Sequence, residues 1–211
     1  MAAYALARKG YLALQGDPDP SLATDLAKAA GESVGVESPH LLALSYALQA
    51  RGLALGGQRD PCLARLDAAA EALAQSTTDS SPPAWPRQPW YFSSEHLHSH
   101  IGACYPHIGR SPEAVDLIRG RLAGLPDEYR IERGRQLSQL AVAHAYNDDP
   151  ATAAETGLEA FDIAVETGSS ALCEDLHRLA TRLARFDVAA VHRFKEALAA
   201  SGGSSVPPYR H

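Results

Sequence analysis

The chain has 211 residues and a net charge of −6, with 45% hydrophobic and 7% aromatic residues. This length suits one domain or one short array and is sufficient to bury a core. The acidic balance argues against a large nucleic-acid surface, because phosphate binding needs clustered Lys and Arg. The longest basic run, 130–135, is interrupted by Glu132 and is interpreted as a solvated helix face.

The number of cysteines and the hydropathy of the sequence indicate the cellular compartment of the protein. Cys62, Cys104 and Cys173 form an odd and sparse set, which argues against a disulfide framework and fits a reducing cytoplasm. No apolar run approaches the ~18 to 20 residues of a membrane span. Residues 1–9 also lack the apolar core of a signal peptide. We therefore expect a soluble, cytoplasmic protein without a membrane partner.

Helical periodicity dominates the sequence, and no strand-like alternation persists. Proline and cap residues set several boundaries; Pro39, for example, opens a helix that Ser38 caps. Pro106 is expected to kink or end the helix that precedes it, because proline cannot donate a backbone hydrogen bond. The pattern predicts helices at residues 4–14, 22–30, 41–55, 60–75, 92–105, 111–124, 128–147, 150–167, 169–185 and 187–200.

Two stretches have the composition of exposed segments rather than of helices. Residues 77–89 are rich in Ser and Pro, and we expect a loop that Trp85 and Trp90 pin onto the helices. The tail 201–211 is rich in Gly, Ser and Pro and is expected to be disordered. Residues 1–200 would then form one repeat domain.

One stretch carries the spacing of a known helical repeat. The residues, in order, are His98, Ile101, Gly102, Tyr105, Ala114, Ile118 and Pro126. The tetratricopeptide pattern, Trp-x2-Leu-Gly-x2-Tyr, then Ala-x3-Phe, then Pro, has the same offsets. Its small residues let two antiparallel helices touch, and its large residues fill the gap between pairs. The sequence therefore predicts an all-α, tetratricopeptide-like array of antiparallel helix pairs, an α-solenoid.

The predicted repeats are degenerate. Ala23, Ala64, Ala114 and Ala153 align as the small residue of each second helix, at spacings of 41, 50 and 39 residues. Each spacing exceeds the roughly 34 residues of the standard repeat. In the fourth unit, His144 stands where the pattern has Tyr. Stacking of neighbouring pairs would bury the faces that one pair leaves exposed.

The same stretch resembles a family of regulators. Glu95–Arg110, followed by Pro112–Ala114, looks like the C-terminal half of actinobacterial helix-turn-helix transcription regulators. These carry an N-terminal DNA-binding domain of the XRE type and a tetratricopeptide-like C-terminal domain. Residues 135–144 and 176–198 resemble later parts of that domain, so the resemblance covers roughly residues 40–200.

The resemblance implies ligand sensing, dimerisation or partner binding, with no direct nucleic-acid contact by this segment. Because the repeat-like region begins at Met1, we expect the effector part of such a regulator without its DNA-binding domain, or a co-factor to one. A free-standing scaffold protein is the alternative. The partner would be a protein, a peptide or a small-molecule effector, and a homodimer is compatible with this reading.

In tetratricopeptide arrays the first helix of each pair lines a concave groove. Counting from Gly52, Gly102 and Ala141 predicts the groove residues Tyr46, Gln49, Leu53, His96, Ser99, Ala103, Arg135, Ser138 and Val142, with Tyr146 at the far end. This mixture suits a peptide or a small polar ligand, and Arg135 could pair with a carboxylate in bidentate fashion. The alternative is a solvated concave face without a ligand.

Two patterns would indicate catalysis, and neither is preferred. Ser33 lies in a Gly-x-Ser-x-Gly sequence, but a nucleophile elbow needs a preceding strand, and a helix is predicted there. His96, His100, Cys104 and His107 would share one helical face and could bind zinc. A single helix rarely supplies a whole tetrahedral site, so packing positions are the preferred interpretation. We therefore expect a protein without enzymatic activity, cofactor or metal ion, and a metal-dependent or serine hydrolase is the remote alternative.

Overall fold

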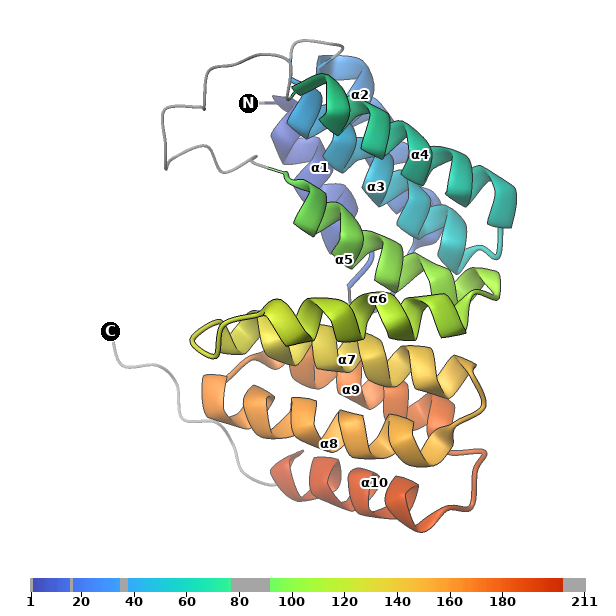
Figure 1. The fold of residues 1–211 in the computed structure, drawn as a ribbon, viewed down its shortest axis with the longest axis vertical. Helices are drawn as coiled ribbons and strands as arrows, with labels where there is room; N and C mark the ends of the chain where they lie inside the picture. Colours follow the sequence, from blue (N-terminus) through green and yellow to red (C-terminus); the bar gives the residue numbers. More distant parts are fainter. Residues whose placement is uncertain (1, 16, 35–37, 77–91, 203–211) are drawn as a thin grey trace. The chain divides into compact units, whose positions relative to one another are not determined.

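The computed structural model describes residues 2–15, 17–34, 38–76 and 92–202 of the chain. Within these ranges every regular element is a helix, and no strand is present, as Figure 1 shows. The predicted all-α class is therefore confirmed. No helix of the described residues combines the length and the apolar character that crossing a bilayer requires.

The chain divides into two compact units, Met1–Ile108 and Gly109–His211, here called unit 1 and unit 2. Unit 1 contains α1 (Ala2–Leu12), α2 (Pro20–Val34), α3 (Pro39–Leu55), α4 (Arg59–Ser76), α5 (Ser94–Cys104) and the 3-10 helix η1 (Tyr105–Ile108). Unit 2 contains α6 (Ser111–Gly124), α7 (Arg130–Tyr146), α8 (Pro150–Thr167), α9 (Ser170–Leu183) and α10 (Ala189–Gly202). The two halves of the predicted repeat motif, α5 and α6, thus belong to different units.

In unit 1, consecutive helices pack against each other through small side chains. Helix α2 packs on α1 and α3, and α3 packs on α4. Ala23, Ala27 and Ala30 of α2 are fully buried, so the backbones can approach closely. The Oγ of Ser45 in α3 donates a hydrogen bond of 2.6 Å to the carbonyl of Ala27, which ties the two helices inside the core.

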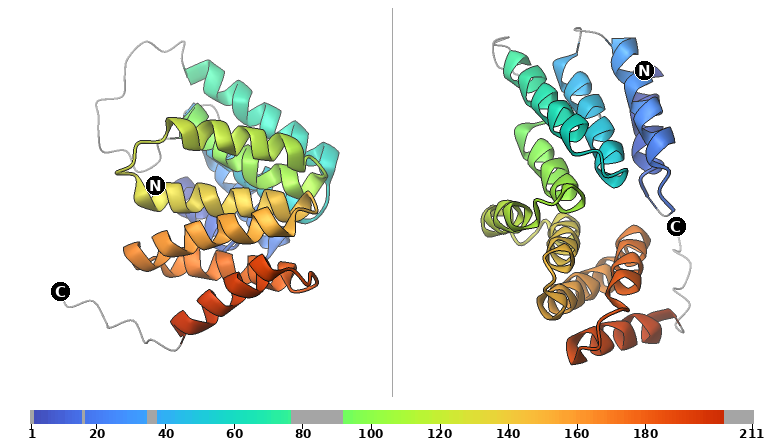
Figure 2. Two further views of the ribbon diagram at one scale, coloured as in Figure 1. Left: turned by 60° about the horizontal axis from the view of Figure 1, so that its bottom comes forward. Right: turned by 90° about the vertical axis from the view of Figure 1, so that its right-hand side faces the viewer.

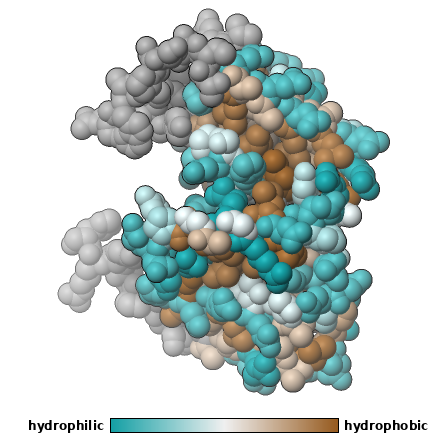
Figure 3. All heavy atoms as spheres, in the orientation of Figure 1, coloured by the Kyte–Doolittle hydropathy of each residue, from teal (hydrophilic) through white to brown (hydrophobic). Residues whose placement is uncertain are grey.

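A second core in unit 1 joins α3, α4 and α5. Cys62, Leu66 and Ala69 of α4 are buried in it, together with Leu97 and Cys104 of α5. Half-buried α3 side chains, among them Leu42 and Leu44, pack against this core. In the view of Figure 3, hydrophobic residues of unit 1 show among hydrophilic ones in the region of α3, α4 and α5.

Unit 2 is organised around α8, which packs on α7, α9 and α10. In both views of Figure 2, α7 and α8 lie side by side. Helix α9 presents a buried stripe of Leu172, Leu176, Leu179 and Leu183, at the three- and four-residue spacing of an amphipathic helix. The ring of Phe194 in α10 is fully buried in the same core.

Most predicted helix boundaries lie within a few residues of those in the structure. Pro39 occupies the first turn of α3, although the Ser38 side chain makes no capping hydrogen bond. Helix α5 ends at Cys104 and continues as η1, so Pro106 lies in a short 3-10 turn, as expected for a residue that ends an α-helix.

Helix α2 is longer than predicted, because it continues to Val34. Helix α10 begins and ends two residues later than predicted, so it includes residues 201 and 202 of the expected tail. The expected loop with Trp85 and Trp90, and the remainder of the tail, lie outside the described residues.

Candidate functional site

The predicted groove residues of α3 differ in accessibility. Tyr46 is half-buried, and the guanidinium carbon of Arg65 lies 5.6 Å from the centre of its ring. Gln49 is only 5% exposed, and its Nε2 donates a hydrogen bond of 3.2 Å to Ser45 Oγ. Leu53 packs half-buried against the core. Tyr46 keeps accessible surface for a ligand, whereas Gln49 has almost none, because it completes a buried hydrogen-bond chain.

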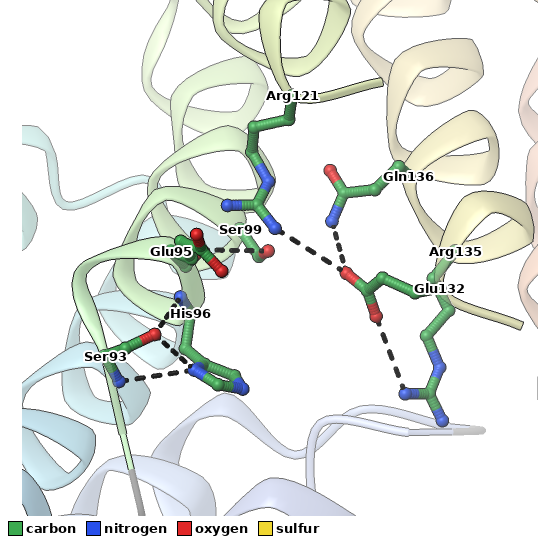
Figure 4. Close-up of polar contacts among 8 residues, drawn as sticks. All are labelled: Ser93, Glu95, His96, Ser99, Arg121, Glu132, Arg135 and Gln136. Atoms are coloured by element: carbon green, nitrogen blue, oxygen red, sulfur yellow. Dashed lines mark hydrogen bonds and ion pairs between the residues drawn. The ribbon is translucent and has the colours of Figure 1, made fainter. Parts of the chain in front are cut away.

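On α5, the predicted groove residues His96 and Ser99 make hydrogen bonds to their own helix and its N-terminal cap. The Ser93 amide donates a hydrogen bond of 3.2 Å to His96 Nδ1, and Ser93 Oγ accepts one from the His96 amide. This reciprocal arrangement is a capping box with His in place of the usual Glu. The hydroxyl of Ser99 donates to the Glu95 carbonyl at 3.4 Å (Figure 4). Ala103 is half-buried on the same helix.

The His and Cys residues of the candidate zinc face have separate surroundings. His100 packs edge-on against Phe92, with ring centres 5.5 Å apart. Burial, with smaller contributions from Arg51 and His96, lowers the pKa of His100 to about 3, and its Nδ1 is buried without a hydrogen-bond partner. Within the described ranges no three His, Cys, Asp or Glu side chains come together as metal ligands would.

Cys104 belongs to the core rather than to a metal site. It is fully buried beside Cys62 of α4, and the two thiols are hydrogen-bonded. Burial is the main cause that raises the pKa of Cys104 well above its ordinary value, and the contact with Cys62 raises it further. A protonated, enclosed thiol is a poor nucleophile and a poor metal ligand.

Ser33 lies in the last turn of α2, not in a nucleophile elbow. Its hydroxyl is exposed and donates a hydrogen bond of 2.7 Å to the carbonyl of Ala29, one turn earlier in the helix. No strand precedes it in the described part of unit 1. The arrangement therefore lacks the strained strand-to-helix turn on which an elbow serine depends.

In unit 2, the predicted carboxylate-binding residue Arg135 already has an acidic neighbour. Its Nη1 lies 4.0 Å from Glu132 Oε2, and 53% of its side chain is exposed. Glu132 Oε1 also accepts a hydrogen bond of 2.8 Å from Gln136 and lies 3.9 Å from Arg121 Nη2 of α6 (Figure 4). Glu132 thus connects α6 to α7, and Arg135 lies at the exposed edge of this cluster.

The other predicted residues of α7 become more accessible toward its C-terminal end. Ser138 is 4% exposed and is therefore part of the interior. Val142 is half-buried against the core of unit 2, and Tyr146 is half-buried in the last turn. His144, which replaces the repeat Tyr, is 5% exposed, with Nδ1 3.7 Å from Asp149 Oδ2. Burial and then Arg119 lower its pKa, while Asp149 opposes the shift.

A basic hollow that the sequence reasoning missed lies beside Tyr146. Its volume is about 460 Å³. The lining residues, here called the α9 pocket, are Arg178, Thr181, Arg182 and Arg185. The three arginines recur at a spacing of four and three residues; Arg178 and Arg182 lie on one face of α9, and Arg185 lies in the turn directly after the helix. That spacing is the signal that could have found them, and the leucines between the arginines indicate the opposite, buried face.

Each arginine of the α9 pocket is held by a neighbouring side chain. The guanidinium carbon of Arg182 lies 3.6 Å from the ring centre of Tyr146. Arg185 Nη2 lies 3.3 Å from Asp148 Oδ1, and Arg178 pairs with Asp175. Burial raises the pKa of Tyr146, and the nearby Arg182 opposes this rise. The pocket is therefore a pre-arranged set of cationic groups that can accept an anion.

Asp148 owes its position to the turn between α7 and α8. It has a φ of 53° and is the one non-glycine residue of the described ranges with positive φ. Asp tolerates this left-handed conformation better than most residues. Its neighbour Asp149 accepts a hydrogen bond of 3.1 Å from the Thr152 amide and so caps α8. The turn thereby fixes an acidic partner for Arg185.

Comparisons with family models, with curated proteins and with solved structures find no match to this chain. The function proposed below is therefore argued from the residues and their geometry.

Proposed function

We propose that the chain is a non-catalytic binding module for a protein, peptide or small-molecule effector. The observation that carries this proposal is the α9 pocket, where three cationic side chains line one accessible hollow and the central one, Arg182, stacks on the half-buried ring of Tyr146. Aromatic rings combined with Arg are the side chains that most often dominate binding surfaces. No acid, base or nucleophile of the pocket is arranged for bond-breaking chemistry among the described residues.

The tetratricopeptide-like arrangement is part of the proposal. Its support is the packing of consecutive helices in pairs, α1 with α2, α3 with α4, and α7 with α8. In such arrays each pair leaves one helix accessible, which suits binding along a surface better than catalysis in an enclosed cleft. Tyr46 and Tyr146 fit this role, because each is half-buried on a first helix and is covered on one side by an arginine.

The regulatory role follows from the resemblance of the chain to the C-terminal domains of helix-turn-helix regulators. In this proposal the module is the effector part of, or a co-factor to, such a regulator. It would alter transcription through the partner that it binds, by favouring one of two conformations of the assembly. A free-standing scaffold protein is the second candidate.

Transcript profiling tests the regulatory role. A strain that lacks the gene is complemented with the wild-type chain or with the Arg182→Gln, Arg185→Gln variant of the α9 pocket. We expect a defined set of transcripts to change on deletion, to recover with the wild-type chain and to remain altered with the variant. The variant protein must be as abundant and as helical as the wild type. An unchanged transcript profile on deletion would reject the regulatory role and favour the scaffold.

A further inference from the structure

Three cationic side chains, two on α9 and one in the turn after it, open to the same hollow. Arg178, Arg182 and Arg185 line the α9 pocket together with Thr181. Arg178 and Arg182 lie one helical turn apart on α9, and Arg185 lies two residues beyond the end of the helix. The pocket is wide open to solvent. Its shape therefore suits a segment that lies along the helix rather than a small molecule that is enclosed.

Arg182 is the central group, and it is both rigid and electrostatically available. Tyr146 holds its guanidinium in place at 3.6 Å from the ring centre. In the described part of unit 2, Arg182 has no ion pair with a carboxylate. Stacking of a guanidinium on an aromatic face leaves its N–H groups, which lie in the plane of the guanidinium, able to donate to a second group.

The acidic neighbours of the other two arginines lie at the rim and can be displaced. The side chains of Arg185 and Asp148 are 60% and 80% exposed, and such exposed pairs contribute little to stability. Asp175 and Arg178 are one helical turn apart on α9 itself. Because Arg182 has no such acidic partner in the described part of unit 2, it adds a positive charge to the pocket in a chain whose net charge is −6.

The spacing of the arginines favours carboxylates on a peptide. Arg178 and Arg182 are four residues apart on α9, which separates them by about 6 Å along the helix axis. Alternate side chains of an extended peptide are separated by roughly 6.6 to 6.8 Å. A long polyanion would extend beyond the pocket and meet the negative charge of the rest of the protein. A short peptide interacts mainly with the charged groups of the pocket, because salt screens charges that are more than about 8 to 10 Å apart.

We infer that the α9 pocket binds an acidic peptide segment, with its carboxylates paired to Arg182 and to the flanking Arg178 and Arg185. The inference rests on the proposed function, because it names the ligand class of the same binding module.

A titration with a defined probe tests it. Fluorescein-labelled decaglutamate and its decaglutamine counterpart are titrated with the full chain, and fluorescence anisotropy is recorded at two salt concentrations. The pocket variant is Arg182→Gln, Arg185→Gln. The matched control is Arg8→Gln, Arg193→Gln, which removes the same charge from an arginine stacked on Tyr11 and from an exposed ion pair with Glu155. Circular dichroism verifies that both variants keep their helicity.

The wild-type chain and the control should bind decaglutamate with dissociation constants within about twofold of each other, and the pocket variant at least tenfold more weakly. Decaglutamine should not bind, and added salt should weaken the wild-type affinity. Equal weakening by the control would overturn the inference, as would the absence of decaglutamate binding up to millimolar protein. Tighter binding of a single-stranded oligonucleotide than of decaglutamate would also overturn it. Because the transcript assay does not involve the probe, failure of the peptide assay alone leaves the regulatory role standing.

Discussion

The guanidinium of Arg182 lies over the ring of Tyr146, 3.6 Å from its centre. Tyr146 ends α7, and Arg182 lies near the end of α9, so the contact joins two helices of unit 2. It places the central cation of the α9 pocket at one defined position. Tyr146 therefore acts in the proposed binding as a positioning residue, through the orientation of Arg182.

Replacement of Tyr146 should weaken peptide binding when the aromatic ring is lost, and not when only the hydroxyl group is lost. Tyr146→Leu should raise the dissociation constant of decaglutamate by about threefold to tenfold, because cation–π contacts contribute roughly 0.5 to 2 kcal/mol. Tyr146→Phe keeps the ring and should stay close to the wild type. The anisotropy titration measures both. Equal losses in the two variants would assign the effect to the hydroxyl group instead of the ring.

Stability should fall at acidic pH because of His100. Its folded-state pKa of about 3 lies below the ordinary value of 6.5, so the unfolded chain takes up the proton first. The free energy of unfolding should therefore be highest above pH 6.5 and decrease as the pH falls toward 3. From pH 7 to pH 5 the loss should be about 2 kcal/mol, since one pKa unit corresponds to about 1.4 kcal/mol. His144, whose pKa is also lowered, acts in the same direction.

Urea unfolding at pH 7 and pH 5 measures this dependence. His100→Phe keeps a ring against Phe92 and removes the titrating group, so its unfolding free energy should vary less with pH than that of the wild type. His98→Gln, on the exposed face of the same helix, serves as the control and should keep the wild-type slope. A His100→Phe slope identical to that of the wild type would contradict the assignment.

Two glycines should respond to Ala in opposite directions. A Cβ on Gly52 would meet the side chain of Thr24 and the carbonyl oxygen of Pro20, the latter at 2.7 Å. Gly52→Ala should destabilise the chain by about 1 to 3 kcal/mol, because α2 and α3 would have to separate. A Cβ on Gly120 in α6 would meet no atom within 4 Å, so Gly120→Ala should stabilise by roughly 0.5 to 1 kcal/mol. Thermal unfolding by circular dichroism distinguishes the two.

Thiol reactivity should separate the three cysteines. Cys62 and Cys104 are fully buried, whereas Cys173 is half-buried, with its pKa raised by burial and then by Glu174. With an aromatic disulfide reagent at pH 8, one thiol should react in the native protein and the other two only after unfolding. Cys173→Ser should remove the native phase. Simultaneous reaction of all three thiols would contradict the buried core of α4 and α5.

Local signals are sufficient to predict the helices. Pro39, Pro112 and Pro150 each occupy the first turn of a helix, where proline is tolerated, and Gly168 ends α8 with a φ of 64°. Such signals depend only on neighbouring residues, so a single sequence reveals them. The degree of burial depends on which side of a helix meets the next one, and that is decided by packing.

The repeat register illustrates this limit. The repeat pattern aligns Ala64 with the small residues Ala23 and Ala153, yet Ala64 is exposed, while Cys62 and Leu66 are buried in the same helix. For the same reason, the repeat pattern predicts Gln49 in the groove, although its side chain is buried in the core. In an alanine-rich helix many positions can serve as the small contact residue, so the pattern does not fix the rotation of the helix about its axis.

The candidate site depends on contacts that are distant in sequence. The repeat pattern predicts Tyr146, but its partner Arg182 is 36 residues further along the chain. The spacing of Arg178, Arg182 and Arg185 indicates a shared face, which by itself is also typical of a solvated helix. Only the placement of α9 beside the end of α7 joins the cations to an aromatic ring and an open hollow.

The most direct test of the account is the transcript profile of a strain whose chain carries Arg182→Gln and Arg185→Gln. We expect this strain to reproduce the transcript changes of the deletion strain, while the matched Arg8→Gln, Arg193→Gln strain resembles the wild type at equal protein abundance. If deletion alters transcripts and the pocket variant does not, the α9 pocket does not carry the function proposed here.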